Sequence, residues 1–320
     1  MEDLLQIARC PDSQTSLHWS SDRSELRAET GAIYRFHEGV AQLLPSPPAH
    51  GPDPFADVRA FYESEGWAAD ESGLFGDTKA FVDTRPTSFN FTRKCMLRLN
   101  KHFARGGRFL LDAGSGPIAH DEFLTYGDRF QRRICVDLSV QALRVAKAKL
   151  GPRALCLQGD LTNLPIKSST IDAVTCNHVI YQIPAEHQAK AFLELWRVLR
   201  PGGVAVVVYW WPETPLAWKL ERIARALRLQ GERDDAPASS APARALNHFP
   251  LSRAWFEAQA WPFRYRYESF RVISNAFMRR YVSDDWRGRL FLDAVFALQR
   301  LAPSYCGKHG LMPTIIFRKD

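Results

Sequence analysis

The stretch from residue 108 to residue 118 constrains the fold most. An apolar run, Phe109-Leu110-Leu111, leads into Asp112 and is followed at once by Gly114 and Gly116. This pattern is typical of a buried strand that breaks into a tight glycine turn. Glycine suits such a turn because it accepts positive φ and leaves the backbone open to a ligand. A dinucleotide-binding domain also uses a turn of this kind, so the segments that follow must decide.

Polar residues recur at the ends of the next expected strands. Asp137, Asp160 and Asn177 follow expected strands over 133–137, 154–158 and 171–177. Amphipathic patterns over 139–150 and 185–199 predict helices between strands, so we expect a parallel sheet with its site at the carboxyl ends of the strands. An acid in the position of Asp137 can accept both ribose hydroxyls of an adenosine.

The ordered series resembles class I S-adenosylmethionine-dependent methyltransferases. The resemblance is carried by the glycine turn, in which Ile118 replaces the third glycine of the family pattern, by Gly159-Asp160, by Leu164-Pro165-Ile166 with the polar turn and strand after it, and by the run 199–203. It implies an α/β fold with a Rossmann-like seven-stranded sheet, whose last strand is antiparallel, and a helical lid insertion at about 212–250. It also implies S-adenosyl-L-methionine as cofactor and S-adenosyl-L-homocysteine as product.

The resemblance assigns a cofactor site. Its expected residues are Asp112, Gly114, Gly116, Asp137, Leu138, Asp160, Leu161 and Asn177. In similar methyltransferases the acid at Asp160 accepts the adenine amino group, and the next backbone N–H, that of Leu161, meets the ring. A carboxylate that only caps a turn is the alternative for Asp160.

A second group of residues is expected to face the methyl acceptor. The candidate bases or orienting groups are His178, Tyr181 and Tyr62, and the candidate acceptor-binding residues are Trp67, Tyr209, Trp210, Trp211 and His248. Aromatic faces of this kind shape a pocket or hold a cationic amine. The alternatives are plain packing for the aromatic residues and a capping or packing role for His178.

The chain before the glycine turn divides into two expected parts. Residues 1–45 look like a small β-rich module similar to the zinc-ribbon-like domain that accompanies or activates several methyltransferases. Ser13 stands where metal-binding relatives have the partner of Cys10, and no further cysteine precedes Cys95, so we expect a version without metal. Residues 46–107 are expected to form a linker and N-terminal cap helices, and 108–320 the methyltransferase domain.

Composition narrows the setting. The six cysteines form no Cys-x-x-Cys pair and are expected to be buried free thiols in a reducing compartment. The longest apolar run, near 204–211, is too short to span a bilayer, so the expected location is the cytoplasm. The sequence does not define an oligomeric state.

Three functions remain open. The first is methyl transfer by in-line displacement to a small-molecule N-, O- or C-nucleophile. The second is an RNA methyltransferase, favoured by the net charge of +7 and the N-terminal module, although the basic residues are scattered and the Asn-Pro-Pro-aromatic tetrad is absent. The third is a non-catalytic scaffold that keeps the fold, for which Ile118 is the main argument.

Overall fold

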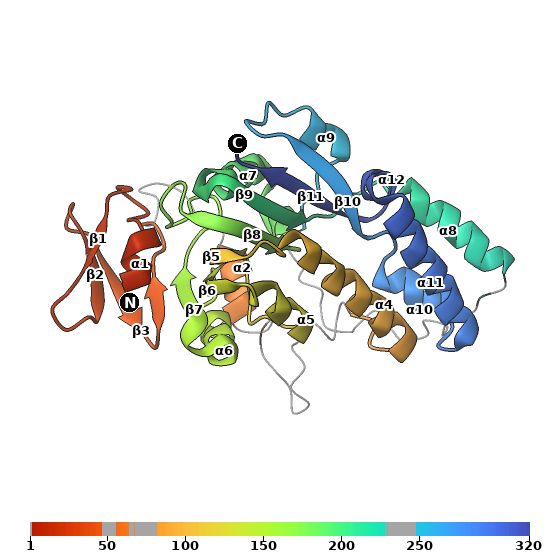
Figure 1. Cartoon of the computed structure of the whole chain (residues 1–320), viewed down its shortest axis with the longest axis horizontal. Coiled ribbons are helices and arrows are strands. Elements are labelled where there is room, and N and C mark those ends of the chain that lie inside the picture. The colour runs from red at the N-terminus through yellow and green to blue at the C-terminus, as the bar shows by residue number, and fades with distance from the viewer. Residues whose placement is uncertain (1, 47–55, 64–66, 68–81, 228, 230–247) are drawn as a thin grey trace.

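The computed structural model describes residues 2–46, 56–63, 67, 82–227, 229 and 248–320 (Figure 1). The strands are β1 (Leu17–Trp19), β2 (Glu25–Ala28), β3 (Ile33–His37), β4 (Val40–Gln42), β5 (Gly107–Ala113), β6 (Phe130–Asp137), β7 (Ala154–Gln158), β8 (Ile171–Asn177), β9 (Leu199–Val208), β10 (Tyr265–Arg271) and β11 (Met312–Arg318). The α-helices are α1 (Glu2–Ile7), α2 (Ala56–Phe61), α4 (Pro86–Leu97), α5 (Asp121–Leu124), α6 (Val140–Leu150), α7 (Ala185–Val198), α8 (Pro215–Ala226), α9 (Arg253–Glu257), α10 (Asn275–Tyr281), α11 (Trp286–Leu301) and α12 (Pro303–His309).

The central sheet is of the Rossmann-like α/β type. Its strands follow the order β7-β6-β5-β8-β9-β11-β10, and β5 to β9 run parallel. Strand β11 is antiparallel to both β9 and β10, so β10 points the same way as the parallel strands. The carboxyl ends of β5, β6, β7, β8, β9 and β10 therefore meet at one edge of the sheet.

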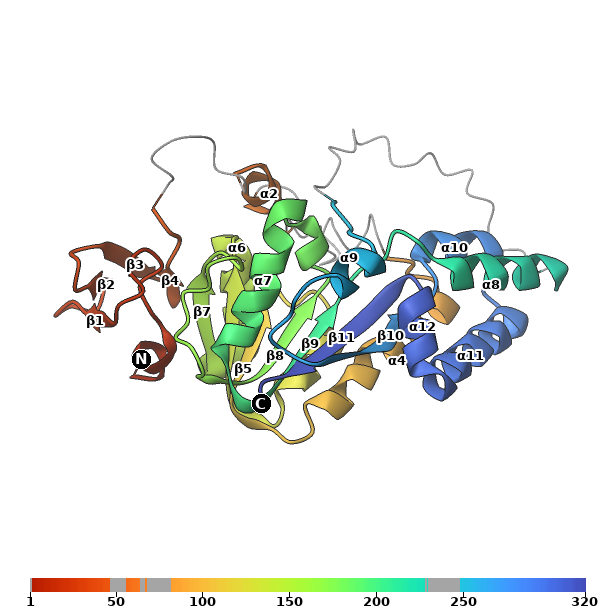
Figure 2. The ribbon, with the colours of Figure 1, turned by 90° about the horizontal axis from the view of Figure 1, so that it is seen from above.

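Helices cover both faces of this sheet (Figure 2). On one face α7 buries Phe192 and Leu195 against the sheet, in a core that continues to Phe256 of α9. On the other face α4, α8, α10 and α11 form a second core around residues such as Phe91 and Met278. Because helices cover both faces of the sheet, β5 and β8 are buried along most of their length.

The N-terminal strands extend the sheet. Strand β4 pairs in parallel with β7, which adds β1 to β4 and brings the sheet to eleven strands. Ala8 forms a bridge to Ile166, and Arg9 pairs with Glu194 of α7 at 3.4 Å. The first 45 residues thus share a hydrophobic core with the remainder of the chain. Their four strands are additional to the seven strands expected from the sequence.

Other differences from the expected elements are small. Leu199 begins β9 instead of ending α7, because the chain is already extended there and pairs with β8. The cap helices expected within 46–107 include α4, which passes into a 3-10 turn over Arg98–His102. Of the lid expected at about 212–250, helix α8 is described and lies beside α10 and α12 (Figure 1), whereas residues 230–247 and most of the expected linker lie outside the described residues. Within the described ranges, no helix is long and apolar enough to cross a membrane.

Candidate functional site

The glycine turn after β5 has the expected backbone conformation. Gly114 and Gly116 have φ values of 70° and 51°, in the left-handed region. A Cβ atom at Gly114 would collide with Val179, and one at Gly116 would lie 2.8 Å from the Trp67 ring. Both positions therefore require glycine for conformation and for space.

Ile118 keeps the conformation of the glycine that it replaces. Its φ is 53°, although a β-branched side chain disfavours this region, and its side chain is buried against α6 and β6. The turn is therefore retained at a cost in backbone strain of about 1–3 kcal/mol. The departure from the family pattern leaves the course of the backbone intact.

Asp137 ends β6 beside this turn. One carboxylate oxygen accepts a hydrogen bond from the Gly116 N–H at 2.8 Å, and the other accepts one from the Ser139 N–H at 3.0 Å. Burial raises the pKa of Asp137 to about 6, even though these backbone donors act in the opposite direction. Ser139 in turn caps α6 by accepting from Ala142 N–H.

Asn177 ends β8 at the same edge. Its amide nitrogen donates to the Thr175 hydroxyl at 2.9 Å, but its buried Oδ1 has no hydrogen-bond partner among the described residues. A buried acceptor left in this state costs free energy unless a ligand or water supplies a donor. Asn177 Oδ1 is thus an acceptor facing a position that the described chain leaves without a donor.

The other two expected acids already have partners. Both oxygens of Asp160 accept from Thr162, one from its N–H and one from its hydroxyl, each at 2.7 Å, so this carboxylate caps a turn. Asp112 forms a buried ion pair with Arg133 of β6 at 2.5 Å. The leucines beside the acids contribute at the backbone or in the core: the carbonyl of Leu138 accepts from Gln158, and Leu161 is buried.

Four of the residues expected to face the acceptor gather into one group, here called the aromatic cluster: His178, Tyr181, Trp210 and His248. The Tyr181 ring lies 4.9 Å from His248 and 6.0 Å from Trp210, and the Trp210 and His248 rings are 5.2 Å apart, all between centroids. His178 meets Tyr181 edge-on at 6.4 Å. The cluster joins the ends of β8 and β9 to residue 248, beyond the end of the undescribed segment.

Tyr209 and Trp211 are buried behind the cluster. Both are 1% exposed. The Tyr209 ring meets Tyr181 edge-on at 5.9 Å, and the Trp211 ring lies 5.1 Å from Tyr209. The Tyr209 hydroxyl donates to Gln188, and the Trp211 indole donates to the Gly307 carbonyl at 2.9 Å. Both side chains brace the core instead of forming a pocket wall.

His178 is held in an unusual conformation and charge state. Its φ is 63°, and its ring packs against Phe270 at 5.1 Å. Burial, together with the nearby charges of Arg271 and His120, lowers the pKa of His178 to about 3. The imidazole is therefore neutral at physiological pH and can accept a hydrogen bond.

A short segment before α4 lies over the glycine turn. The Tyr62 hydroxyl donates to Gln182 at 2.7 Å, and the Tyr62 ring stacks on Trp67 at 5.1 Å. Glu63 accepts from the Val140 N–H at the start of α6 at 2.6 Å. Trp67 itself meets Gly116, so this segment covers the edge between the glycine turn and the aromatic cluster.

The sequence analysis missed several residues of this edge. Arg133, Glu63 and Gln182 support the expected residues by ion pairing or hydrogen bonding. Arg271 ends β10 with 4% of its surface exposed. In the sequence, Arg271 follows an alternating aromatic run. This pattern does not distinguish a buried arginine at a site from an arginine that faces solvent.

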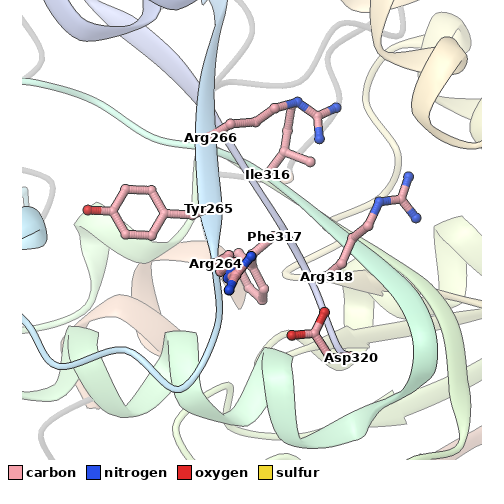
Figure 3. A pocket seen from close by; sticks show the side chains of 7 residues that line it. All are labelled: Arg264, Tyr265, Arg266, Ile316, Phe317, Arg318 and Asp320. Carbon is pink, nitrogen blue, oxygen red and sulfur yellow. The ribbon is translucent and has the colours of Figure 1, made fainter.

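A separate hollow lies on the other edge of the sheet (Figure 3). It encloses about 270 Å³ and is lined by Arg264, Tyr265, Arg266, Ile316, Phe317, Arg318 and Asp320. Because β10 begins and β11 ends there, this hollow is at the amino ends of the parallel strands. It is remote from the glycine turn, and none of the expected site residues lines it.

Part of the chain is similar to a known sequence family. Residues 111–207 match the family described as a methyltransferase domain. The matched region begins within β5 and ends within β9, so it includes the glycine turn and the strand ends at Asp137 and Asn177.

Individual relatives match over the same region only. A protein of Aspergillus luteorubrus named "Probable methyltransferase ltbC" is 33% identical over 108 residues, which are 30% of this chain and 38% of that protein. An uncharacterized chloroplastic methyltransferase of Arabidopsis thaliana is 31% identical over 108 residues, 31% of this chain and 30% of that protein. The chain thus covers only 38% and 30% of the length of these two relatives.

Solved structures resemble the chain more broadly but weakly. Phosphoethanolamine N-methyltransferase 2 of Haemonchus contortus, in complex with S-adenosyl-L-methionine, is 16% identical, with a TM-score of 0.48, over 86% of this chain and 61% of that one. A SAM-dependent methyltransferase of Archaeoglobus fulgidus is 15% identical, with a TM-score of 0.42, over 76% of this chain and 98% of that one. These scores and identities are low, so the class rests on the match over residues 111–207.

Proposed function

We propose that the protein transfers a methyl group from S-adenosyl-L-methionine to a small-molecule acceptor. The observation that carries this proposal is the meeting of a bare glycine turn, the Asp137 carboxylate and the unpartnered Asn177 oxygen at one edge of the sheet, directly beside the aromatic cluster. Cofactor and acceptor must be neighbours for methyl transfer, and this edge provides two adjoining sets of groups.

The residues present fit the cofactor. Asp137 has the right chemistry to accept ribose hydroxyls, and Asn177 Oδ1 to accept from the amino group of the methionine part. Gly114 and Gly116 leave the backbone approachable where any Cβ would obstruct it. When bound, the cofactor supplies a methyl group on a sulfonium sulfur, which leaves as a neutral thioether. Each Asp160 oxygen already accepts one hydrogen bond from Thr162, so the adenine amino group would have to use the second lone pair of one of them. Leu161 would contribute its backbone N–H.

The chain's own part in the reaction is to position the acceptor. Tyr181, Trp210 and His248 offer aromatic faces and edges to an apolar or cationic group. A neutral His178 can accept a hydrogen bond from the acceptor's O–H or N–H and so direct its lone pair toward the methyl carbon. Holding the reacting atoms near 3 Å apart in line contributes most of the acceleration expected from such a site.

Two further elements complete the proposal. The segment with Tyr62, Glu63 and Trp67, together with α8, would close over the acceptor and exclude water. The first 45 residues act as a metal-free structural extension, because Cys10 is engaged by the Tyr34 hydroxyl at 3.1 Å and by the Ser13 N–H at 3.4 Å.

The test is a transfer assay. The purified protein is incubated with methyl-labelled S-adenosyl-L-methionine and a cell extract, and small molecules are separated from RNA and protein. Label in the small-molecule fraction supports the proposal. Nuclease-sensitive label in the large fraction would make the protein an RNA methyltransferase, and no label together with no binding of S-adenosyl-L-homocysteine would favour a scaffold. The variant Asp137→Ala is the control, because it should lose both binding and transfer.

A further inference from the structure

Arg271 is a buried cation without a carboxylate partner. Its side chain is at the carboxyl end of β10, in a residue that is 4% exposed, and no described aspartate or glutamate forms an ion pair with it. Burying an unpaired charge costs several kcal/mol, so such a residue is rare without a reason. Burial also lowers the pKa of the Arg271 guanidinium, which shows that its surroundings compensate the charge incompletely.

The hydrogen bonds of Arg271 use one end of the guanidinium only. Nη1 donates to the Thr92 hydroxyl at 3.2 Å and to the Asn275 side-chain oxygen at 2.8 Å, which ties β10 to α4 and α10. Nε is buried and has no partner among the described residues, and none of them accepts from Nη2. The N–H groups of Nε and Nη2 point the same way and form the fork that matches two oxygens of a carboxylate or phosphate.

The free fork belongs to the acceptor side of the site. The charge of Arg271 lowers the pKa of His178, and Tyr181 is among the groups that act electrostatically on Arg271, so the guanidinium is close to the aromatic cluster. Phe270, the preceding residue, packs its ring on His178 at 5.1 Å. The order of β9, β11 and β10 brings the end of β10 to the same edge as the ends of β8 and β9.

The described carboxylate that acts electrostatically on Arg271 is engaged by another arginine. Asp83 is close enough to act on Arg271 electrostatically, but its two oxygens accept from the guanidinium of Arg85, at 2.7 Å for the shortest contact. Arg85 in turn donates to the carbonyls of Met278 and Val282. Asp83 and Arg85 thus form a closed pair, and the charge of Arg271 is left for something that the described chain does not contain.

We propose that Arg271 binds an anionic oxygen group of the methyl acceptor, a carboxylate or a phosphate, through its free Nε and Nη2 fork. This inference rests on the proposed function and narrows its substrate class to anionic small molecules. Arg271 is a binding and specificity residue: it fixes one end of the acceptor, while His178 and the aromatic rings direct the end that receives the methyl group.

The first test measures the charge of the product. The wild-type protein labels the small-molecule fraction of an extract with methyl-labelled S-adenosyl-L-methionine, and the product is applied to an anion-exchange resin at pH 7. We expect mass spectrometry to show a carboxylate or a phosphate on the labelled product, and a product with net negative charge to be retained and to elute with salt. Treatment with a phosphatase distinguishes the two sources, because it removes the phosphate of a monoester and leaves a carboxylate unchanged. A labelled product that carries neither group overturns the inference but leaves the methyltransferase proposal standing.

The second test uses variants. Arg271→Gln should lower kcat/KM for the acceptor about 100-fold, since two charge-assisted hydrogen bonds are lost. Arg271→Lys keeps the charge without the fork and should lower it about tenfold, mainly through KM. The affinity for S-adenosyl-L-homocysteine should stay within twofold in both variants, a split that a purely structural role would not produce.

Arg98 offers a matched control. It is another arginine next to β10, and its Nη1 is likewise buried without a partner among the described residues. Unlike Arg271, it donates from Nη2 to the backbone carbonyls of Ser269 and Phe270, and its charge is not among those that lower the pKa of His178. Arg98→Gln should therefore lower stability without raising the KM for the acceptor. Unchanged acceptor kinetics in Arg271→Lys, or equal losses for acceptor and S-adenosyl-L-homocysteine, would show that Arg271 is only a brace. Absence of any labelled product from the wild type would instead remove the proposed function itself.

Discussion

The carboxylate of Asp137 and the backbone N–H of Gly116 are joined by a hydrogen bond of 2.8 Å. This contact links the end of β6 to the glycine turn after β5, two segments that are 21 residues apart in the sequence. The group expected to bind the cofactor ribose thus also fixes the turn beside it. Burial raises the pKa of Asp137 to about 6. Binding of the ribose and fixing of the turn both use the ionised carboxylate, so both depend on pH near this value.

The first prediction concerns pH. Ionised Asp137 is the form that accepts ribose hydroxyls, so the affinity for S-adenosyl-L-homocysteine should fall about tenfold per pH unit below pH 6. The stability of the ligand-free protein has the opposite dependence at this residue: a raised pKa favours folding below the ordinary value of 3.8, and that contribution is lost as the pH rises through 6. Calorimetric titration at pH 5 to 8 measures the first effect. Affinity that does not change over this range would contradict the assignment of Asp137.

The second prediction concerns the glycine turn. Gly116→Ala should abolish measurable binding of S-adenosyl-L-homocysteine, because its Cβ would lie 2.8 Å from Trp67 at a left-handed φ of 51°. Gly31→Ala is the control, since Gly31 also has a positive φ, 88°, but open space around the added Cβ. Both variants should lose about 1–2 kcal/mol of unfolding free energy from backbone strain. Loss of binding in both, or in neither, would mean that the close contact at Gly116 is irrelevant.

The third prediction concerns His178. Its pKa of about 3 means that the rate of transfer should show no inflection near pH 6.5 from this residue. His178→Asn should keep the fold, because asparagine tolerates a positive φ, and should lower kcat about 10- to 100-fold by removing the orienting ring nitrogen. The depressed pKa also predicts stability that is complete above pH 6.5 and is lost as the pH falls toward 3. A rate profile with a limb at 6.5 that disappears in His178→Asn would refute the neutral-imidazole role.

The fourth prediction concerns the buried pair of Asp112 and Arg133. Arg133→Met leaves the carboxylate buried and unpaired and should lower the unfolding free energy by about 3–5 kcal/mol. Adding Asp112→Leu should recover part of this loss, because the double variant buries no charge. Arg27→Met, which breaks an exposed pair with Glu25, should change stability by about 0.5 kcal/mol or less. Urea unfolding measures all three, and additive losses in the double variant would argue against a coupled pair.

Part of this arrangement could be predicted from local pattern. The glycine turn, the strand ends at Asp137 and Asn177 and the Ser139 cap are each encoded within a few residues, so periodicity and turn chemistry reveal them. Partners that are distant in the sequence could not be found in this way. The Tyr209 hydroxyl donates to Gln188 and the Trp211 indole to Gly307, 21 and 96 residues away, so the burial of these two side chains could not be expected from the run 209–211 itself.

The alternation of strands and helices, the glycine turn and the resemblance to methyltransferases can be predicted from the sequence, because they depend on spacing along one chain. Which distant residues meet depends on the tertiary structure. The antiparallel insertion of β11 places β10 at the edge of the sheet and so brings Arg271 to His178, and the parallel pairing of β4 with β7 joins the first 45 residues to the same sheet. Such contacts follow from the order of strands in space, which no local pattern of residues records.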